Sequence, residues 1–516
     1  MARTARLLAS AAVKPEGSNR QAPGLALPES ALGRAAALLV MLFLSGKTAL
    51  LLATYLSNTG VLFGYPYQFD YVEGILLYAV RELRAGGTIY PDLSELPALI
   101  GFYPPLYHWL CAALDIPTDN PFLVGRAISF VSGLAVAAMI YRLVAARAGW
   151  LWGAVSALLF YYSPIVQNWT LLYRVDVLGV MLSFAGILVV AECRERPAVL
   201  FAAPLFLLAA LTKHSFVAAP VAAAVFLWLN SPRRAVEFAV LYGAGVVVAF
   251  GWLVYTTDGQ AWKHLVDYNA GHPFTFEQAY HYTVSFLRTD GIVFASAAAY
   301  AVYSVSGKQT PLATIYFATA CLTLLSVGKM GASENYFLEV IAVSCVLCGL
   351  WLRQCFEQTR NDSRIAVTAV SLLAVHAFQA GPSMMFRTPT DEDRILRDRI
   401  SAEVRRLAPD TIWTEDASLA VVNGAVPVAD TFSATQLAKA SLWDQSMVLG
   451  AFENGQIPLV ILDGGMFGRP RTGHRQRMTE EIHHALNAHY RIHRKFQWGR
   501  FELRVPKKAD APASLR

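Results

Sequence analysis

The chain alternates between long apolar blocks and short polar connectors over most of its length. Blocks of roughly 17–25 residues are long enough for a helix to cross about 30 Å of hydrocarbon. A helix satisfies its own backbone hydrogen bonds inside lipid, so the pattern predicts membrane-spanning helices. About eleven are expected with a window of roughly 19 residues, near residues 34–56, 122–144, 150–166, 175–193, 197–212, 214–230, 235–255, 290–306, 311–327, 334–352 and 365–383. The stretch 105–116 is too short and opens with two prolines, which predicts an interfacial or re-entrant helix.

Composition and charge agree with this pattern. Of 516 residues, 55% are apolar and 16% are charged, which excludes an ordinary soluble enzyme and indicates a polytopic, all-α membrane protein. The net charge of +6 comes from basic residues between apolar blocks, a signal of orientation rather than of nucleic-acid binding. Residues 1–33 have scattered Arg and Lys, followed by Pro, Gly and Ser, which predicts a disordered cytoplasmic tail.

Loop charge predicts which side of the membrane each connector occupies. Alternate short connectors carry the basic residues Arg142, Arg147, Arg194, Arg196, Arg233, Arg234, Lys308, Arg353, Arg360 and Arg364. Such loops face the cytoplasm in most membrane proteins. An odd number of spans then places the polar C-terminal segment outside, and we expect a multi-pass protein of the cytoplasmic (inner) membrane.

The composition changes sharply at residue 388. The segment 388–516 opens with the charged helical pattern "DEDRILRDRISAEVRRLAP", followed by β-like runs in "TIWTE", "IPLVILDG" and "RFELRV". A second helix is predicted over 479–494, "TEEIHHALNAHYRIHR". We therefore expect a membrane domain over 34–387, with a large first outer loop at 57–121, and a small extracytoplasmic α/β domain.

Ionisable residues gather at the predicted outer ends of the spans. Such groups are costly near hydrocarbon, so they are usually paired or functional. A carboxylate can take the proton of an acceptor hydroxyl, and Lys or Arg can hold a phosphate leaving group, so acids beside cations suit transfer from a phosphate-linked donor. The outer-face set is Asp70, Glu73, His108, Arg174, Asp176, Lys213, His214, Lys329 and Glu334.

Structural interpretations of the same residues stay open. Asp70 and Glu73 are spaced as the N-cap and third residue of a helix, as in a capping box with Asp at its start. Arg174 and Asp176 are close enough in sequence for a local ion pair, which would contribute little. Lysines at span ends also reach toward lipid headgroups.

Six sequence pieces in order carry a resemblance to a known family. They are "FDYVEGILLYAVRELRAGGTIY", "FYPPLYHWL", "GRAISFVSG", "YRVDVLG", "LTKHSF" and "KMGASENYFLE". The chain resembles the GT-C class of integral-membrane glycosyltransferases, in particular the polyprenyl-phosphate-sugar-dependent branch of protein O-mannosyltransferases and aminoarabinose–lipid A transferases. The resemblance covers about residues 57–345, and it implies a membrane fold of that class with a soluble outer domain.

The resemblance implies a catalytic base in the first outer loop. Many members have adjacent Asp and Glu there, whereas Tyr71 and Val72 separate Asp70 from Glu73 in this chain. Asp70 is the favoured base and Glu73 a supporting acid, with the division between them left open. Asp176 is expected to act as a further acid near the donor or acceptor.

Other matched positions are expected to bind the substrates. The cations Arg174, Lys213 and Lys329 would neutralise the donor phosphate. The residues expected to line the substrate site are Tyr103, His108, His214, Glu334 and Asn335.

The implied activity is transfer of a sugar from a polyprenyl-phosphate-linked donor to a hydroxyl of a glycan, lipid or protein outside the membrane. Membrane lipids are the other expected partners, and nucleic acid is not. No residue set demands a metal ion, but members of the class differ on divalent cations, so a divalent cation stays open. The alternative function is a lipid-linked-sugar transporter or flippase without catalysis; such proteins tend to show inverted repeats and broken helices at mid-membrane, and no internal repeat is visible in this chain.

Overall fold

The structure is a computed structural model that describes residues 31–114, 116, 118–193, 197–309, 311–358, 363–379, 388–463, 477–497 and 500–507. The predicted tail 1–33 lies almost entirely outside the described residues. By internal contacts the chain forms two units, Met1–Ala49 and Leu50–Arg516. The first described helix, α2 (Ala31–Phe63), starts in the first unit, and all later elements belong to the second.

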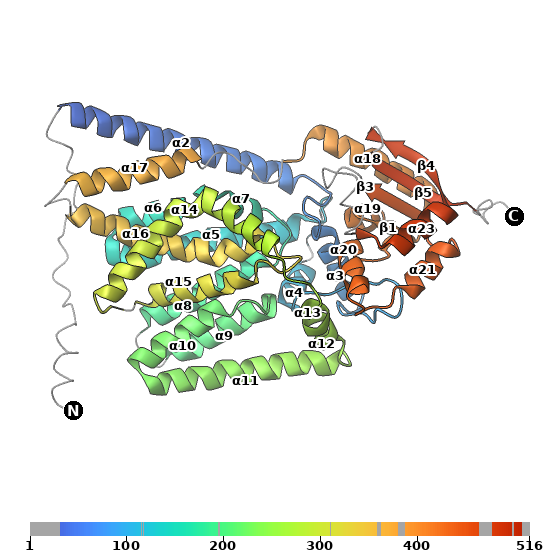
Figure 1. Cartoon of the computed structure of the whole chain (residues 1–516), viewed down its shortest axis with the longest axis horizontal. Helices are drawn as coiled ribbons and strands as arrows, with labels where there is room; N and C mark the ends of the chain where they lie inside the picture. The colour runs from blue at the N-terminus through green and yellow to red at the C-terminus, as the bar shows by residue number, and fades with distance from the viewer. Residues whose placement is uncertain are drawn as a thin grey trace. The chain divides into compact units, whose positions relative to one another are not determined.

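Every predicted span coincides with a helix, which confirms the mostly helical membrane fold. Four helical runs are long and apolar enough to cross a membrane by themselves: Leu38–Phe63, Leu123–Ala148, Pro232–Thr256 and Glu334–Glu357. The helices at the predicted spans, seen in Figure 1, are α2, α5 (Leu123–Ala148), α6 (Trp150–Tyr162), α8 (Asp176–Glu192), α9 (Pro197–Thr212), α10 (Ala218–Asn230), α11 (Pro232–Thr256), α14 (Phe276–Ser306), α15 (Leu312–Thr323), α16 (Leu338–Gln358) and α17 (Ser363–Gln379).

Short helices fill the connectors. The stretch predicted to be an interfacial helix is α4 (Leu106–Ala113), which comes after α3 (Glu73–Arg84). The predicted span 150–166 is divided at Ser163, because Pro164 starts the separate helix α7 (Pro164–Trp169) and the Ser163 side chain caps it. The remaining short helices are α12 (Gln260–Trp262), η1 (Lys263–Asp267), α13 (Tyr268–Ala270), η2 (Leu324–Ser326) and η3 (Glu334–Phe337).

Helix α16 lies at the centre of the bundle. Of its most apolar window, 89% is buried by protein, compared with 11% for α11. It packs against α5, α6 and α14. The η3 turn that leads into it carries Glu334 and Asn335, so two predicted site residues are attached to the most buried of the four long helical runs.

The C-terminal segment contains one five-stranded sheet in the order β2-β1-β3-β5-β4. Strands β2 (Val426–Pro427), β1 (Thr411–Thr414) and β3 (Leu459–Asp463) are parallel. Strands β5 (Phe501–Pro506) and β4 (Tyr490–Phe496) continue the sheet in antiparallel pairing. The predicted α/β composition of this segment is confirmed.

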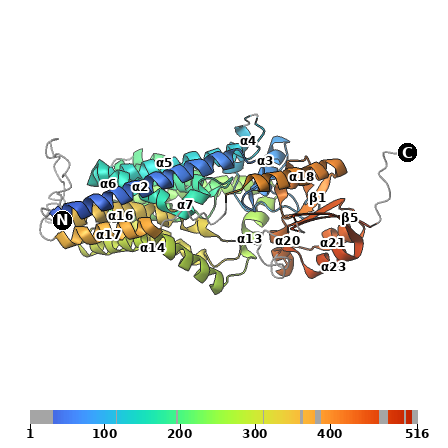
Figure 2. The same ribbon diagram turned by 90° about the horizontal axis from the view of Figure 1, so that it is seen from above.

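Helices cover both faces of the sheet. Trp413 and Val460 face a core with α20 (Thr431–Lys439), α21 (Ser446–Glu453) and α23 (Glu480–His489). Ile412 and Ile461, their neighbours along the strands, face α18 (Asp391–Leu407) and α19 (Ala417–Val421). This alternation is the period-2 pattern of strands. Figure 2 shows α18 on the opposite side of the sheet from α21 and α23.

One predicted C-terminal helix is too long. The helix expected over 479–494 ends at His489, and Tyr490–Phe496 forms β4 instead. Strand β4 pairs with β5 over the whole length of β5. The first and last residues of β4, Tyr490 and Phe496, are buried, one in each of the two cores. Pairing with a distant strand therefore overrides the local helical pattern.

The first outer loop completes both cores of the sheet domain. Tyr65 and Tyr67 pack with α18 and Ile412, and Leu93 and Ile100 pack with Trp413 on the other face. The backbone also joins the sheet edge, since Ala98 pairs with Ala429 in a parallel bridge. The loop is consequently an integral part of the C-terminal fold.

Small residues allow the helices of the bundle to approach closely. At Gly186 in α8, an added Cβ would lie 2.4 Å from the Phe206 ring of α9, whereas a Cβ at Gly243 in α11 would meet nothing within 4 Å. Such residues let membrane helices pack backbone to side chain. Gly186→Ala should therefore destabilise the α8–α9 contact by overpacking, by about 1–3 kcal/mol.

The measurement is the thermal unfolding midpoint in detergent, with Gly243→Ala as the matched control. The control gains the same methyl group and the same helix propensity. An equal midpoint for the two variants would contradict the packing of α8 on α9.

Candidate active site

A fully buried ion pair joins the first outer loop to the bundle. Glu73, at the start of α3, and Arg126, in the first turn of α5, are both 0% exposed. Glu73 Oε1 accepts from Arg126 Nε at 3.1 Å, and Oε2 accepts from Nη2 at 2.9 Å. The pair is thus bidentate, the geometry in which Arg and a carboxylate interact most strongly.

Backbone groups complete the coordination of this pair. Arg126 donates to the carbonyl oxygens of Leu62, Tyr65 and Tyr67 at 2.6–2.8 Å. Glu73 accepts in addition from the amides of Phe69, Asp70 and Tyr173. With all these bonds made and no exposed surface, Glu73 holds the loop in shape, and this position does not favour the supporting catalytic role expected for it.

The predicted capping box is wrong in its register. The N-cap of α3 is Val72 and Glu73 is its first helical residue, so Asp70 does not cap the helix. Asp70 Oδ2 instead accepts from the Val72 amide at 3.3 Å, in a turn of its own. The bonds from Glu73 back to the amides of Phe69 and Asp70 replace the reciprocal half of such a box.

Asp70 and Arg174 meet at the surface of this buried core. Asp70 Oδ2 lies 3.0 Å from Arg174 Nη1, and the two side chains are 15% and 7% exposed. Arg174 Nη2 donates to the Tyr103 hydroxyl at 3.2 Å, and the guanidinium lies 5.0 Å from the centre of the Trp169 ring. Within the described chain, Asp70 Oδ1 has no hydrogen-bond partner and is available to a substrate.

A second acid–cation pair adjoins the first. Asp176, at the start of α8, accepts from Lys213 Nζ at 2.8 Å and from Asn335 Nδ2 at 2.7 Å on the same oxygen, Oδ1. Its other oxygen, Oδ2, lies 3.6 Å from Arg174 Nε, too far for a hydrogen bond. The four groups thus alternate in charge from Asp70 through Arg174 and Asp176 to Lys213. The interaction between Arg174 and Asp176 is therefore part of a network rather than an isolated pair.

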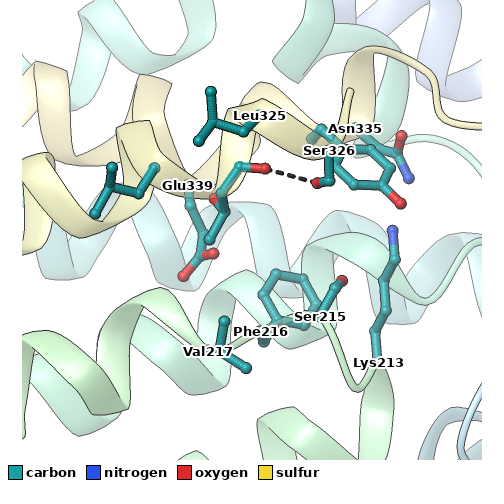
Figure 3. Close-up of a pocket in the computed structure, with 11 residues that line it drawn as sticks. Lys213, Ser215, Phe216, Val217, Leu325, Ser326, Asn335 and Glu339 are labelled. Atoms are coloured by element: carbon teal, nitrogen blue, oxygen red, sulfur yellow. Dashed lines mark hydrogen bonds between the residues drawn. The ribbon is translucent and has the colours of Figure 1, made fainter. Parts of the chain in front are cut away.

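A cavity of about 300 Å³ opens beside Lys213 and Asn335. Figure 3 shows the Lys213 ammonium at one end of it, while Phe216, Val217 and Leu325 lie farther along. The lining comes from the α9–α10 connector, from η2 with the end of α15, and from η3 with the start of α16; it comprises Lys213, Ser215, Phe216, Val217, Leu322, Thr323, Leu325, Ser326, Asn335, Tyr336 and Glu339. The cavity therefore has a cationic end and a mostly apolar body.

Lys329 and His214 are two further predicted site residues. Lys329 is half-buried, and in the described part of the chain no acidic group pairs with its ammonium. Burial lowers the pKa of Lys329 from its usual value. Burial lowers the pKa of His214 to about 4, and the positive charges of Lys213 and Lys329 lower it further.

Glu334 is the third acid near the cluster. It is 2% exposed, accepts from the Ser333 hydroxyl at 3.2 Å, and interacts electrostatically with Asp70. The structure thus gathers most of the predicted site residues in one place: Asp70, Tyr103, Arg174, Asp176, Lys213, His214, Lys329, Glu334 and Asn335.

His108 is the predicted residue that is not joined to the cluster. It lies in α4, is 3% exposed, and its Nδ1 has no hydrogen-bond partner. Burial lowers the pKa of His108 to about 4, so the ring is neutral at pH 7. Its nearest aromatic neighbour is Tyr107, in an edge-to-face contact. Its expected place in the substrate site stays a prediction.

Burial also affects the protonation of Asp70. Desolvation raises the pKa of Asp70, and the positive charge of Arg174 opposes that rise. A carboxylate in this position is more basic than one in water, which suits proton abstraction near neutral pH. Among the described residues, no group of three or more His, Cys, Asp and Glu side chains is placed to hold a metal ion.

Sequence reasoning did not single out three residues of the site. Arg126 stands within the quoted piece "GRAISFVSG", and its position inside a predicted span was the available signal. Tyr336 lies under the Lys213 ammonium at 4.6 Å from the ring centre, and Glu339 lines the apolar part of the cavity. Glu339 carried the same signal as Arg126, because it is an acid inside the predicted span 334–352, whereas Tyr336 carried none.

Comparison with known proteins finds a family match and a similar fold. Residues 103–255 match the family described as dolichyl-phosphate-mannose-protein mannosyltransferase, and this stretch contains Tyr103, Arg174, Asp176 and Lys213. The fold is that of the GT-C membrane glycosyltransferases, so the resemblance seen in the sequence is confirmed. Sequence comparison with curated proteins finds no match.

Solved structures with this fold include ArnT from Cupriavidus metallidurans bound to undecaprenyl phosphate. At 13% identity the TM-score is 0.58, covering 91% of this chain and 99% of that one. ArnT in the apo state gives 0.58 at 13% identity, covering 89% and 98%. The archaeal oligosaccharyltransferase AglB from Archaeoglobus fulgidus, in complex with an inhibitory peptide and a dolichol-phosphate, gives 0.50 at 12% identity, covering 90% and 75%.

The buried pair and the partly exposed acid should respond differently to loss of charge. Glu73→Gln leaves Arg126 buried without a counter-ion, which should cost about 3–5 kcal/mol of unfolding free energy. Asp70→Asn should cost much less, because Arg174 keeps Asp176 as a neighbour and Asp70 is partly solvated. Thermal unfolding of the two purified variants in detergent measures the difference. Equal unfolding midpoints would contradict the structural role of Glu73.

Proposed function

We propose that the protein is a membrane glycosyltransferase that moves a sugar from a polyprenyl-phosphate-linked donor to an acceptor hydroxyl on the extracytoplasmic face. The observation that carries the proposal is the alternating cluster of Asp70, Arg174, Asp176 and Lys213 next to a cavity that is cationic at one end and apolar along its body. A polyprenyl phosphate has the complementary form, with an anionic head on an apolar tail. The undecaprenyl phosphate bound in the ArnT structure supports a polyprenyl-phosphate-linked donor.

The cations would bind and stabilise the phosphate. Lys213 lies at the end of the cavity, Lys329 acts electrostatically on the adjacent His214, and the Lys329 ammonium has no acidic partner within the described chain. Transfer breaks the bond between the sugar C1 and the phosphate oxygen, so negative charge grows on the departing polyprenyl phosphate. Fixed positive charges in a partly desolvated site stabilise that charge without reorganising.

Asp70 would serve as the base. The acceptor hydroxyl loses its proton to the carboxylate as its oxygen bonds to C1, and the polyprenyl phosphate leaves with the electron pair of the broken bond. Oδ2 is held by Arg174, which leaves Oδ1 for the acceptor hydroxyl. Asp176 Oδ1 accepts from both Lys213 and Asn335, and the side chain is 1% exposed, so we assign Asp176 to orienting the cations.

The extracytoplasmic location rests on loop charge. The site residues come from the connectors opposite those that carry the basic clusters, and such clusters face the cytoplasm. A transporter or flippase, the alternative function, would place its ionisable groups near the middle of the membrane. Asp70, Arg174 and Lys213 instead lie in the segments between helices. No residues are assigned to a divalent cation.

Removing the base should abolish transfer. Asp70→Asn should lower the rate by about a hundredfold or more, because general base catalysis typically contributes 10²–10⁴-fold. The assay follows label from a radiolabelled polyprenyl-phosphate-sugar pool into an envelope extract. Burial raises the pKa of Asp70, so this carboxylate takes up a proton at a higher pH than an ordinary Asp, whose pKa is about 3.9. The wild-type rate should therefore already fall on acidification at pH values above about 3.9. The control is Asp92→Asn, an exposed acid of the same loop; equal rates for the two variants would contradict the assignment.

Removing the cation near the cavity should weaken donor binding. Lys329→Met loses a charged contact to the phosphate, which should raise the Kd for undecaprenyl phosphate by about tenfold or more. Binding of this lipid to the detergent-solubilised protein can be measured by native mass spectrometry. Lys308→Met is the matched control, since Lys308 is exposed in a predicted cytoplasmic connector. Unchanged affinity in Lys329→Met would remove Lys329 from the donor site.

A further inference from the structure

The residue after Asp70 is bound by the C-terminal domain. The Tyr71 hydroxyl donates to Asp430 Oδ1 at 2.6 Å and accepts from the Phe432 amide at 3.0 Å. The Thr431 hydroxyl lies 3.2 Å from the same oxygen. The Arg477 guanidinium stacks on the Tyr71 ring at 3.8 Å from its centre. The side chain next to the proposed base is thus fixed at its ring and at its hydroxyl.

The groups that hold Tyr71 are themselves rigid. Asp430 is the N-cap of α20, where it accepts from the amide and the hydroxyl of Ser433. Burial and the Asp430 carboxylate raise the pKa of the Tyr71 hydroxyl well above its usual value, so it stays a donor at neutral pH. The Tyr71 hydroxyl consequently meets a fixed acceptor rather than a mobile surface side chain.

The contact lies at a distinctive edge of the sheet. Asp430 follows β2, Glu415 follows β1 and Asp463 ends β3, so all three stand at the carboxyl ends of the parallel strands. Ligands of open α/β sheets bind outside this edge. Here the turn that carries Asp70 occupies it, since Gln68 also donates to the Glu415 carbonyl at 3.5 Å.

The backbone on the other side of Asp70 is equally constrained. At Gly74, an added Cβ would lie 2.6 Å from the Ser418 amide of α19, so the start of α3 touches the backbone of the sheet domain. Glu73 is meanwhile held by Arg126 of the bundle. Residues 68–74 are therefore clamped between the two parts of the fold, and Tyr71 is the contact nearest to the base.

We propose that Tyr71 is a positioning residue through which the C-terminal domain holds Asp70 in its reactive place beside Arg174. The inference rests on the proposed function, in which Asp70 is the base. Rotation about the bonds between residues 70 and 71 moves the Asp70 carboxylate directly. A displacement of about 1 Å in a reacting group can cost about a hundredfold in rate. The sheet domain thereby contributes to catalysis without touching the substrate.

The experiment compares Tyr71→Phe with Tyr67→Phe. Tyr67 also joins the first outer loop to the sheet domain, since its hydroxyl donates to Asp398 Oδ1 at 2.7 Å, but this partner lies in α18, on the opposite face of the sheet from α20. Each variant removes one hydroxyl from the same interface. The readouts are kcat and KM with the radiolabelled polyprenyl-phosphate-sugar pool, and amide hydrogen exchange of residues 68–74.

Tyr71→Phe should lower kcat by about tenfold or more, with KM for the labelled donor changed by less than about twofold, and should speed exchange at residues 68–74. Tyr67→Phe should keep kcat within about twofold of wild type. Equal kcat values in the two variants, or a loss confined to KM, would overturn the proposal. Transfer by Asp70→Asn at the wild-type rate would instead overturn the proposed function, whatever the exchange shows.

A second variant keeps the test decisive if Tyr71→Phe folds poorly. Asp430→Asn retains the N-cap of α20, because Asn caps helices as well as Asp, but it replaces the charged acceptor of the Tyr71 hydroxyl with a neutral one. It should lower kcat in the same direction by a smaller factor. An unchanged kcat in Asp430→Asn would count against the proposal.

Discussion

The site depends on the buried pair between Glu73 and Arg126. Two charges removed from water cost free energy, and their attraction offsets that cost only when the remaining polar positions are satisfied. Here they are satisfied by backbone groups before and after the pair: the carbonyls of Leu62, Tyr65 and Tyr67 and the amides of Phe69, Asp70 and Tyr173. The pair thus fixes the end of α2, the turn before α3 and the approach to α8 in one step. Asp70 and Arg174 lie next to these fixed backbones, so their separation follows from it.

This arrangement gives Asp70 and Glu73 different roles. Glu73 satisfies the backbone and Arg126, while Asp70, three residues earlier, keeps one oxygen available. The sequence left open whether Asp70 or Glu73 is the base, and the burial of Glu73 favours Asp70. Adjacent acids would both have to share the narrow turn, whereas the separation by Tyr71 and Val72 lets one side chain point into the bundle and the other toward the cavity side.

The large features of the fold could be predicted because they depend on length and hydropathy alone. A described helix lies at each of the eleven predicted spans, and the change in composition at residue 388 marks the start of the α/β segment. The errors have a common physical origin in distant contacts. The helix expected through Tyr490–Phe496 was replaced by β4, because β5 provides a strand to pair with, and the break at Ser163 depends on a single proline within an apolar block.

For the site, the sequence could indicate which ionisable residues lie together, whereas their roles stay predictions. Ionisable residues at outer span ends were a valid signal for Arg174, Asp176 and Lys213, because hydrocarbon makes unpaired charge costly there. Arg126 also lies inside a predicted span, where an unpaired charge would be costly, so the same rule applies to it. It was missed because its partner Glu73 was expected to act in the active site and not to form a buried ion pair. No pattern in the sequence indicates that Tyr71 meets Asp430, because the two residues are separated by 359 positions.

The parallel edge of the sheet, where other α/β folds bind small molecules, is filled by the chain's own turn. One consequence concerns how such a protein can be recombined. The bundle and the sheet domain are not interchangeable modules, because residues 64–74 serve as core for one and as active-site wall for the other. A chimera that joins this bundle to a foreign outer domain would have to take the first outer loop from the same source as the sheet. Substitutions in the loop and in the sheet domain should also be correlated.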